Sequence, residues 1–239
     1  MSSVAFGVGD PEQVFLWRYL RPGDVLVDVG ANIGTYSALA LARGAKVEAF
    51  EPDDQASAVL GENLRRNGSE WKLHRTALAD TEGDAPFSAS LDISNRLLPA
   101  MTSEGSMSEA SVTVPVTRLD TLRSSGELWA PTVLKTDAEG FDFQVLAGAE
   151  DTIRDSRPVV ISEIWEGGVE VRSLLERHGY VIFQVNDRTG TPVPCHGGDV
   201  SEGNIVAIPT EQWNNVTERL QEHALVSLRH KVTWERSRQ

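Results

Sequence analysis

The run DVLVDVGANIG at residues 24–34 constrains the fold more than any other part of this sequence. Its apolar residues continue as far as Gly30, which is typical of a strand that is buried on both faces of a sheet. A helical pattern follows over residues 33–43, and residues 46–51 again have the pattern of a buried strand. A strand, a helix and a second strand in this order predict a βαβ unit.

The rest of the chain continues this alternation. Asp10 and Pro11 are residue types that favour a helix start, so we expect a helix over residues 10–23 before the first strand. Further helices are predicted near residues 53–67, 140–155 and 168–178, and further strands at residues 71–78, 132–137, 158–164, 180–186 and 204–209. The pattern predicts an α/β fold with a doubly wound, mostly parallel sheet, in a single domain over residues 1–239.

Two segments interrupt the alternation. Residues 84–116 contain two short strand-like pieces around a stretch rich in Ser, Met and Glu, which predicts an inserted hairpin. Its loop is either a solvated insertion or a lid over the substrate. Over residues 210–239, a C-terminal helix is predicted by apolar residues at helical spacing, namely Trp213, Val216, Leu220, Ala224, Leu228 and Val232. We expect this helix to pack on the core rather than on a partner.

The composition limits the kinds of partner and compartment. A formal net charge of −13 counts against nucleic acids and anionic membranes as partners. No apolar run reaches the roughly 18 residues that a membrane span needs, and the N-terminal residues show neither a secretory signal nor a transit peptide. We therefore expect a cytoplasmic protein that acts on a small molecule. Cys195 is the only cysteine, which excludes an internal disulfide and a cysteine-rich metal site.

The turn after the first strand has the features of a ligand site. Ligands of open α/β sheets bind at the carboxyl ends of the strands, where Gly30 and Gly34 leave room for them. Glu51, at the end of the next strand, can accept both hydroxyls of a ribose, and Asp80, at the end of the third, can accept from an adenine amine. The motif is GxNxG rather than the dinucleotide-binding GxGxxG, so Asn32 stands where a glycine would seat a pyrophosphate. An adenosine with a non-phosphate tail fits better.

Five stretches of the sequence, in order from about residue 24 to 165, resemble the motifs of the FkbM-type methyltransferases: VDVGANIGTYSALAL, FEPD, TALAD, LKTDAEGFDFQVLAGA and RPVVISEI. The resemblance implies the Rossmann-like class I methyltransferase fold and S-adenosylmethionine as cofactor. It also implies that the GANIG turn surrounds the methionine part of the cofactor, that Glu51 holds the ribose and that Asp80 contacts the adenine. The cofactor-binding residues implied in this way are Asp28, Gly30, Ala31, Asn32, Gly34, Glu51, Pro52, Ala79 and Asp80.

The resemblance places LKTDAEG beside the transferred methyl group, and it favours a hydroxyl acceptor on a sugar or a secondary metabolite. Alternation along a strand points Lys135, Asp137 and Glu139 to one side while the strand lasts. A carboxylate there can bind or deprotonate the acceptor hydroxyl, and Lys135 can keep it ionised. Glu163, at the end of the next strand, is a second candidate base, and His196 a third on a loop. These acids could also form a purely structural ion-pair network.

Other interpretations remain open at this point. We predict no metal ion, although Asp137 and Glu163 are residue types that bind hard cations. The spacing of the acids also fits a nucleotide-dependent oxidoreductase, and a methyltransferase fold can serve as a binding module without turnover. The sequence does not decide the identity of the acceptor, or whether the chain forms a homodimer.

Overall fold

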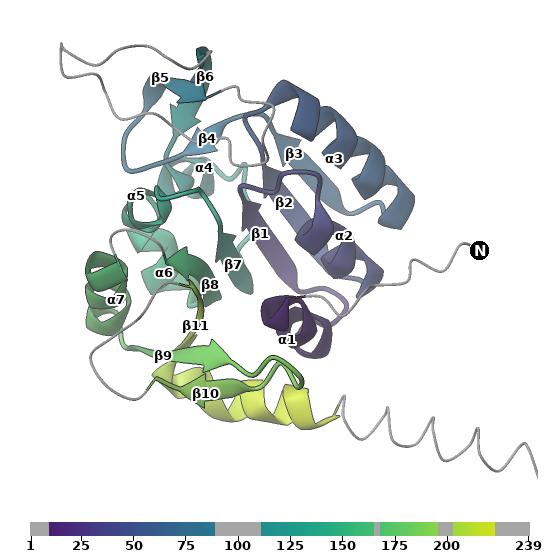
Figure 1. Cartoon of the computed structure of the whole chain (residues 1–239), viewed down its shortest axis with the longest axis vertical. Helices are drawn as coiled ribbons and strands as arrows, with labels where there is room; N and C mark the ends of the chain where they lie inside the picture. The colour runs from purple at the N-terminus through teal and green to yellow at the C-terminus, as the bar shows by residue number, and fades with distance from the viewer. Residues whose placement is uncertain (1–9, 89–110, 165–167, 196–202, 223–239) are drawn as a thin grey trace, which may run out of the picture.

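An eight-stranded sheet runs through the centre of the computed structural model, which describes residues 10–88, 111–164, 168–195 and 203–222 (Figure 1). The strand order is β10-β9-β11-β8-β7-β1-β2-β3. The strands are β1 (Val25–Val29), β2 (Lys46–Phe50), β3 (Trp71–His74), β7 (Val133–Thr136), β8 (Val159–Ile164), β9 (Tyr180–Val185), β10 (Pro192–Pro194) and β11 (Gly203–Pro209). The five neighbouring strands β8, β7, β1, β2 and β3 pair in parallel. Strand β11 is antiparallel to both β8 and β9, and β10 is antiparallel to β9. The predicted mostly parallel α/β fold is confirmed.

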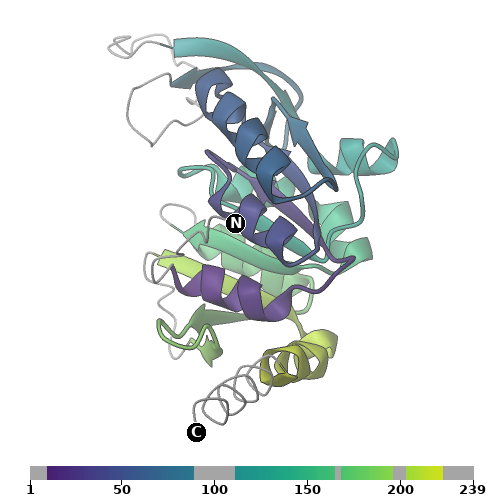
Figure 2. The same cartoon turned by 90° about the vertical axis from the view of Figure 1, so that its right-hand side faces the viewer.

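Helices cover both faces of this sheet (Figures 1 and 2). The first face packs against α1 (Pro11–Tyr19), α2 (Thr35–Ala42), α3 (Asp54–Asn67) and a helix at residues 213–222, which follows the 3-10 turn η1 (Thr210–Gln212). The second face packs against α4 (Leu119–Ser124), α5 (Asp142–Ala147), α6 (Glu150–Ser156) and α7 (Gly168–Arg177). Each face therefore has its own apolar core, and the sheet separates the two. In the described part of the chain, no helix is long and apolar enough to cross a membrane.

The third predicted strand is wrong in one respect. Residues 71–78 do not form one strand, because β3 ends at His74 and the next two-residue strand, β4 (Ala77–Leu78), belongs to a separate three-stranded sheet. That sheet has the order β4-β6-β5 and contains an antiparallel pair, β5 (Gly83–Ser88) and β6 (Ser111–Thr117), where the sequence predicts a hairpin. The proposed lid lies outside the described residues. Asp80 consequently follows a strand of the small sheet rather than the third strand of the large one.

The other differences concern element boundaries. The helical pattern near residues 140–155 forms two helices, α5 and α6, and the first helix ends at Tyr19 because Leu20 is already extended. The sequence analysis missed α4 and the short strand β10. In the C-terminal helix, Val216 and Leu220 are buried in the core of the first face, as predicted. Ala224, Leu228 and Val232 lie outside the described residues.

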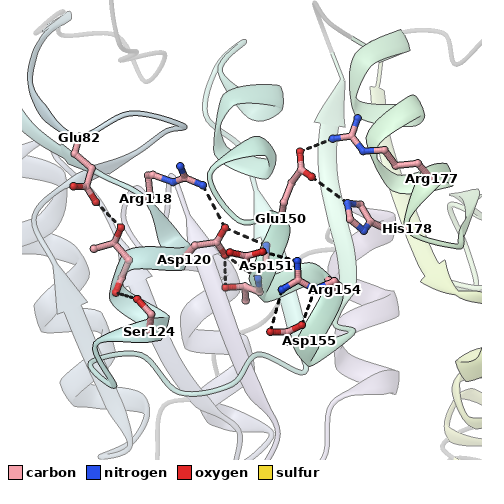
Figure 3. Close-up of polar contacts among 12 residues, drawn as sticks. Glu82, Arg118, Asp120, Ser124, Glu150, Asp151, Arg154, Asp155, Arg177 and His178 are labelled. Atoms are coloured by element: carbon pink, nitrogen blue, oxygen red, sulfur yellow. Dashed lines mark hydrogen bonds and ion pairs between the residues drawn. The ribbon is translucent and has the colours of Figure 1, made fainter.

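Polar contacts join the helices of the second face (Figure 3). The Asp120 carboxylate of α4 accepts hydrogen bonds from the backbone N–H groups of Asp151, at 3.1 Å, and Thr152, at 2.8 Å, in the first turn of α6. Glu150 forms an ion pair with Arg177, and its Oε2 lies within hydrogen-bond distance, 3.3 Å, of Nε2 of His178. Asp120 thus accepts from free N–H groups at the N-terminus of α6, and Glu150 connects α6 to the end of α7. The charges of these acids have a structural role.

Candidate active site

The glycines of the first turn make room for the protein's own atoms. Gly30 has φ of 69°, and a Cβ built on it would lie 1.9 Å from the backbone oxygen of Asp137. Gly34 has φ of 91°, and a Cβ there would lie 2.4 Å from Cδ1 of Leu60. Packing of the protein's own atoms therefore already requires glycine at both positions, and the expectation that they also admit a ligand stays a prediction. Gly30 allows the end of β1 to touch the chain just after β7, so the cofactor turn and the candidate base are packed together.

Replacing Gly30 with alanine should cost more stability than the same change at another glycine of positive φ. Gly126 is the matched control, because its φ is 80° and nothing lies within 4 Å of a Cβ built on it. Gly126→Ala should lose only the roughly 1–2 kcal/mol of left-handed strain, whereas Gly30→Ala adds a clash with backbone. Urea denaturation of both variants measures the difference. Equal losses in the free energy of unfolding would show that the Asp137 contact can relax.

Glu51 is held by backbone hydrogen bonds at the end of β2. Its Oε2 accepts from the N–H of Asn32 at 2.8 Å, and its Oε1 accepts from the N–H of Asp53 at 2.8 Å. Each oxygen retains a free acceptor direction, so the carboxylate is oriented for a pair of hydroxyls. Burial, together with the charges of Asp53 and Asp28, raises the pKa of Glu51 above its ordinary value, even though the two N–H groups oppose the shift.

A cavity lies next to Glu51, where the ends of β1, β2 and β7 meet the small sheet. It is lined by Val29, Gly30, Phe50, Glu51, Pro52, Thr76, Ala77, Leu78, Phe87, Asp137 and Ala138. Four predicted site residues, Gly30, Glu51, Pro52 and Asp137, thus surround one cavity. Asp80 is exposed and, like Ala79, is not among the lining residues, whereas Thr76, Ala77 and Leu78 just before them are. Ala31 is buried in the core of the first face.

A buried lysine connects the acids at the strand ends. The parallel register sets Lys135 of β7 directly opposite Asp28 of β1, and Lys135 Nζ lies 3.5 Å from Oδ1 of Asp28 and 3.2 Å from Oδ2 of Asp137. Its Nζ also lies 4.6 Å from the ring centroid of Tyr36 in α2. Asp137 accepts a side-chain hydrogen bond from Glu163 on β8, and because two ionised carboxylates cannot share a hydrogen bond, the proton of this pair lies on Glu163. The structure therefore brings together Asp28, Lys135, Asp137 and Glu163, each of which the sequence identified.

In this group, the acids and the lysine each stabilise the charged form of the other. Burial alone would raise the pKa of Asp137, but the Lys135 ammonium and the hydrogen bond with Glu163 hold it below its ordinary value. Burial alone would lower the pKa of Lys135, but Asp28 and Asp137 raise it above its ordinary value. At neutral pH, Asp137 is therefore an ionised acceptor and Lys135 a fixed cation.

Three further polar residues of this region were missed by the sequence analysis. Tyr36 covers Lys135, and burial, with the charges of nearby acids, raises the pKa of its hydroxyl so that it stays neutral. Ser37 donates a hydrogen bond of 2.6 Å to Oδ2 of Asp28. Burial raises the pKa of Asp142, in the first turn of α5, to about 6. The run GTYSA contains the first two, but only the packing of α2 on β1 and β7 shows that they face the strand ends.

For two further residues, a catalytic role stays a prediction from the sequence. Glu139 comes after β7 has ended, and its φ of 49° breaks the alternation that would have aligned it with Lys135 and Asp137. His196 lies outside the described residues. The neighbouring Cys195 is a half-buried free thiol that packs against the core of the second face.

Comparisons with a family model and with known proteins indicate the same family. Residues 28–182 match the model of the Methyltransferase FkbM domain. The chain is 33% identical over 138 residues to the hexuronic acid methyltransferase AglP of Haloferax volcanii, a match that covers 58% of this chain and 55% of that protein. It is 29% identical over 199 residues to the 31-O-demethyl-FK506 methyltransferase FkbM of Streptomyces tacrolimicus, which covers 70% of this chain and 76% of the relative.

A solved structure shows the same fold. The crystal structure of methyltransferase FkbM from Methylobacillus flagellatus superposes with a TM-score of 0.54 at 18% identity, over 80% of this chain and 47% of that one. At this identity, the similarity shows the fold alone. The chain spans about half the length of AglP and of this crystallised protein, at 55% and 47%.

Proposed function

This chain belongs to the FkbM methyltransferase family, and from that membership and the site geometry we propose that it transfers a methyl group from S-adenosylmethionine to a hydroxyl of a small organic acceptor. The names of the two relatives support transfer to sugar-like and secondary-metabolite acceptors, since one is a hexuronic acid methyltransferase and the other a 31-O-demethyl-FK506 methyltransferase. The observation that carries the proposal is the hydrogen-bonded pair Asp137 and Glu163, held by Lys135 beside the cavity of Glu51.

The residues around this cavity fit the cofactor. Glu51 has both carboxylate oxygens oriented by backbone and available to ribose hydroxyls, and the apolar side chains of Phe50, Leu78 and Phe87 can sandwich an adenine. Oδ1 of Asp28 is buried and forms an ion pair with Lys135 at 3.5 Å, but it accepts no hydrogen bond among the described residues, and it lies at the end where the resemblance places the methionine part. We propose that the cofactor lies along this edge, from Glu51 to Asp28.

The chain's own residues would act on the acceptor. When bound, S-adenosylmethionine supplies a methyl group that is already activated by its sulfonium. Asp137 and Glu163 would hold the acceptor hydroxyl in line, and the ionised Asp137 would take up its proton as the oxygen forms its new bond to carbon. The carbon–sulfur bond breaks, and the products are a methyl ether, S-adenosylhomocysteine and one proton. Tyr36 and Lys135 close the inner side of this group and fix the orientation of Asp137.

Calorimetry with S-adenosylhomocysteine and with NAD tests the cofactor assignment. We expect saturable binding of S-adenosylhomocysteine and none of NAD, because Asn32 stands where a dinucleotide site needs a glycine. Binding of NAD alone would favour the oxidoreductase. Cofactor binding without methyl transfer to any member of a broad hydroxyl-acceptor panel would favour a binding module.

Removing the Glu51 carboxylate should weaken cofactor binding at least about tenfold, because each lost charge-assisted hydrogen bond is worth ~1.5–3 kcal/mol at most. Calorimetry of Glu51→Ala measures this loss, and Glu62→Gln, an exposed change on α3, is the control. Affinity in the wild type should also fall as acid protonates Glu51, at a pH above its ordinary pKa of 4.5, since burial raises the pKa. Unchanged affinity in Glu51→Ala would refute the ribose assignment.

The proposal includes the broader expectations from the sequence. The net charge of −13 supports a chain that does not bind nucleic acid. Action in the cytoplasm and assembly as a homodimer remain predictions, which fractionation of the native source and light scattering would test.

A further inference from the structure

A second cavity, of about 330 Å³, opens between the start of α1, the end of β9 and the start of β11. Figure 2 shows α1 lying against this end of the sheet. The polar residues that line the cavity are Asp10, Glu12, Gln184, Asp187 and Asn204. Among its described lining residues none is Lys or Arg, so three carboxylates share the cavity without a cation of the protein's own lining. A volume of this size accommodates a small organic ligand.

Glu12 is the residue that points to a ligand. It is only 4% exposed, and its Oε2 has no hydrogen-bond partner in the described part of the chain. Burial raises the pKa of this carboxyl above its ordinary value, and the nearby charges of Asp10 and Asp187 raise it further. A buried acceptor without a donor is costly, and a cationic donor would satisfy it and relieve the repulsion.

The cavity adjoins the group of Asp137 and Glu163. Asn204 of β11 is paired directly with Glu163 of β8, and residues paired in this way across antiparallel strands point to the same face of the sheet. Lys135 is also close enough to lower the pKa of Glu12. A molecule in the cavity would therefore reach the proposed site of methyl transfer along the first face of the sheet.

The arrangement suits an organic cation better than a metal ion. Among the described residues, no three His, Cys, Asp or Glu side chains are grouped closely enough to hold a metal. The carboxylates of this cavity, which Gln184 and Asn204 also line, can instead accept hydrogen bonds from several separate donors of one ligand.

We propose that this cavity is the acceptor subsite and that it selects an acceptor bearing a protonated amino group beside its hydroxyls, as an amino sugar does. The inference rests on the proposed O-methyl transfer and specifies its substrate class. The ammonium group would lie against Glu12 and Asp187, and a hydroxyl of the same molecule would face Asp137 and Glu163. An anionic acceptor such as a uronic acid would be repelled.

Three sugars that differ in one substituent test the proposal: D-glucosamine, D-glucose and D-glucuronate. Binding to the full-length protein is measured by calorimetry, with and without saturating S-adenosylhomocysteine. We expect glucosamine to bind at least about tenfold more tightly than glucose, with glucuronate the weakest and the preference reduced by salt. Asp187→Asn, at an exposed position, and Glu12→Gln should each reduce the preference, whereas Glu62→Gln, an exposed change on α3 that does not line the cavity, should not.

Equal affinity for glucosamine and glucose, tighter binding of glucuronate, or no saturable binding of glucosamine would each overturn the proposal. A loss of S-adenosylhomocysteine affinity in Glu12→Gln would also overturn it, because the carboxylate would then belong to the cofactor site. Failure of the proposed function is a separate result: the wild type would not bind S-adenosylhomocysteine, while the sugar preference could still be measured without it.

Discussion

Replacing Asp137 with asparagine should lower the turnover of methyl transfer by about 10²–10⁴-fold and leave S-adenosylhomocysteine binding close to that of the wild type. The amide keeps the size of the side chain and can still accept a hydrogen bond from Lys135. It cannot take up the acceptor proton. Because Lys135 and Glu163 hold the pKa of Asp137 below its ordinary value, the wild-type residue is ionised throughout the neutral range, and the loss should not depend on pH there.

Glu163→Gln and Asp84→Asn complete the experiment. Glu163 shares the hydrogen bond with Asp137, so its amide should also slow turnover, whereas Asp84 is exposed on β5 and serves as the matched Asp control. Initial rates with labelled cofactor and a pool of hydroxyl acceptors give turnover, and calorimetry gives binding. If both amides transfer methyl at the wild-type rate, neither carboxylate is the base, and the role passes to His196 or to solvent.

Replacing Lys135 with methionine should lower the free energy of unfolding by about 3–5 kcal/mol. Lys135 is 4% exposed and neutralises Asp28 and Asp137, so its loss leaves two carboxylates near one another without a cation. Lys46→Met is the control, since Lys46 pairs with Glu70 at 3.2 Å on the surface, where an ion pair contributes about 1 kcal/mol or less. Chemical denaturation measures the loss of unfolding free energy in both variants. Equal losses would show that the buried ion pairs of Lys135 stabilise the fold no more than the surface pair of Lys46.

The pH dependence gives a second measurement on the same variant. The pKa of Lys135 is raised in the folded protein, so its stabilisation is fully present below the ordinary value of 10.5 and is lost as the pH rises through the raised value. The pKa of Asp137 is lowered, so its contribution is present above 3.8 and is lost as the pH falls through the lowered value. The difference between wild type and Lys135→Met should therefore be constant around neutral pH and shrink at both extremes.

Much of the fold follows from local pattern, and the failures have a common cause. Buried strands such as β1 and β2 are visible because an apolar run between turn residues has few other interpretations. The run at residues 71–78 has the same appearance, yet its two halves join different sheets. The hydrophobic pattern predicts that a segment is buried, but it does not indicate which strand the segment pairs with. Likewise, α4 has only six residues, too few to show a helical period.

The residues of the candidate site also differ in whether local sequence pattern predicts them. Glu51, Lys135, Asp137 and Glu163 could be predicted because each comes at or next to the carboxyl end of a strand, and parallel strands bring such ends to one edge. Asp80 was wrongly placed at a strand end of the large sheet because the strand before it changes sheets. Glu12 and Tyr36 could not be assigned from the sequence, since they reach this edge from helices whose packing depends on the whole first face.

The position of the second cavity has a consequence for how such enzymes diverge. Its polar lining residues, Asp10, Glu12, Gln184, Asp187 and Asn204, all fall outside residues 28–182, the segment matched by the family model. The two flanking segments are remote in sequence but meet at one end of the sheet. With this cavity as the proposed acceptor subsite, substitutions there would change which molecule is modified while Glu51, Lys135 and Asp137 stay in place. Acceptor choice and methyl transfer would then be encoded by different segments of the chain, so that one could change without the other.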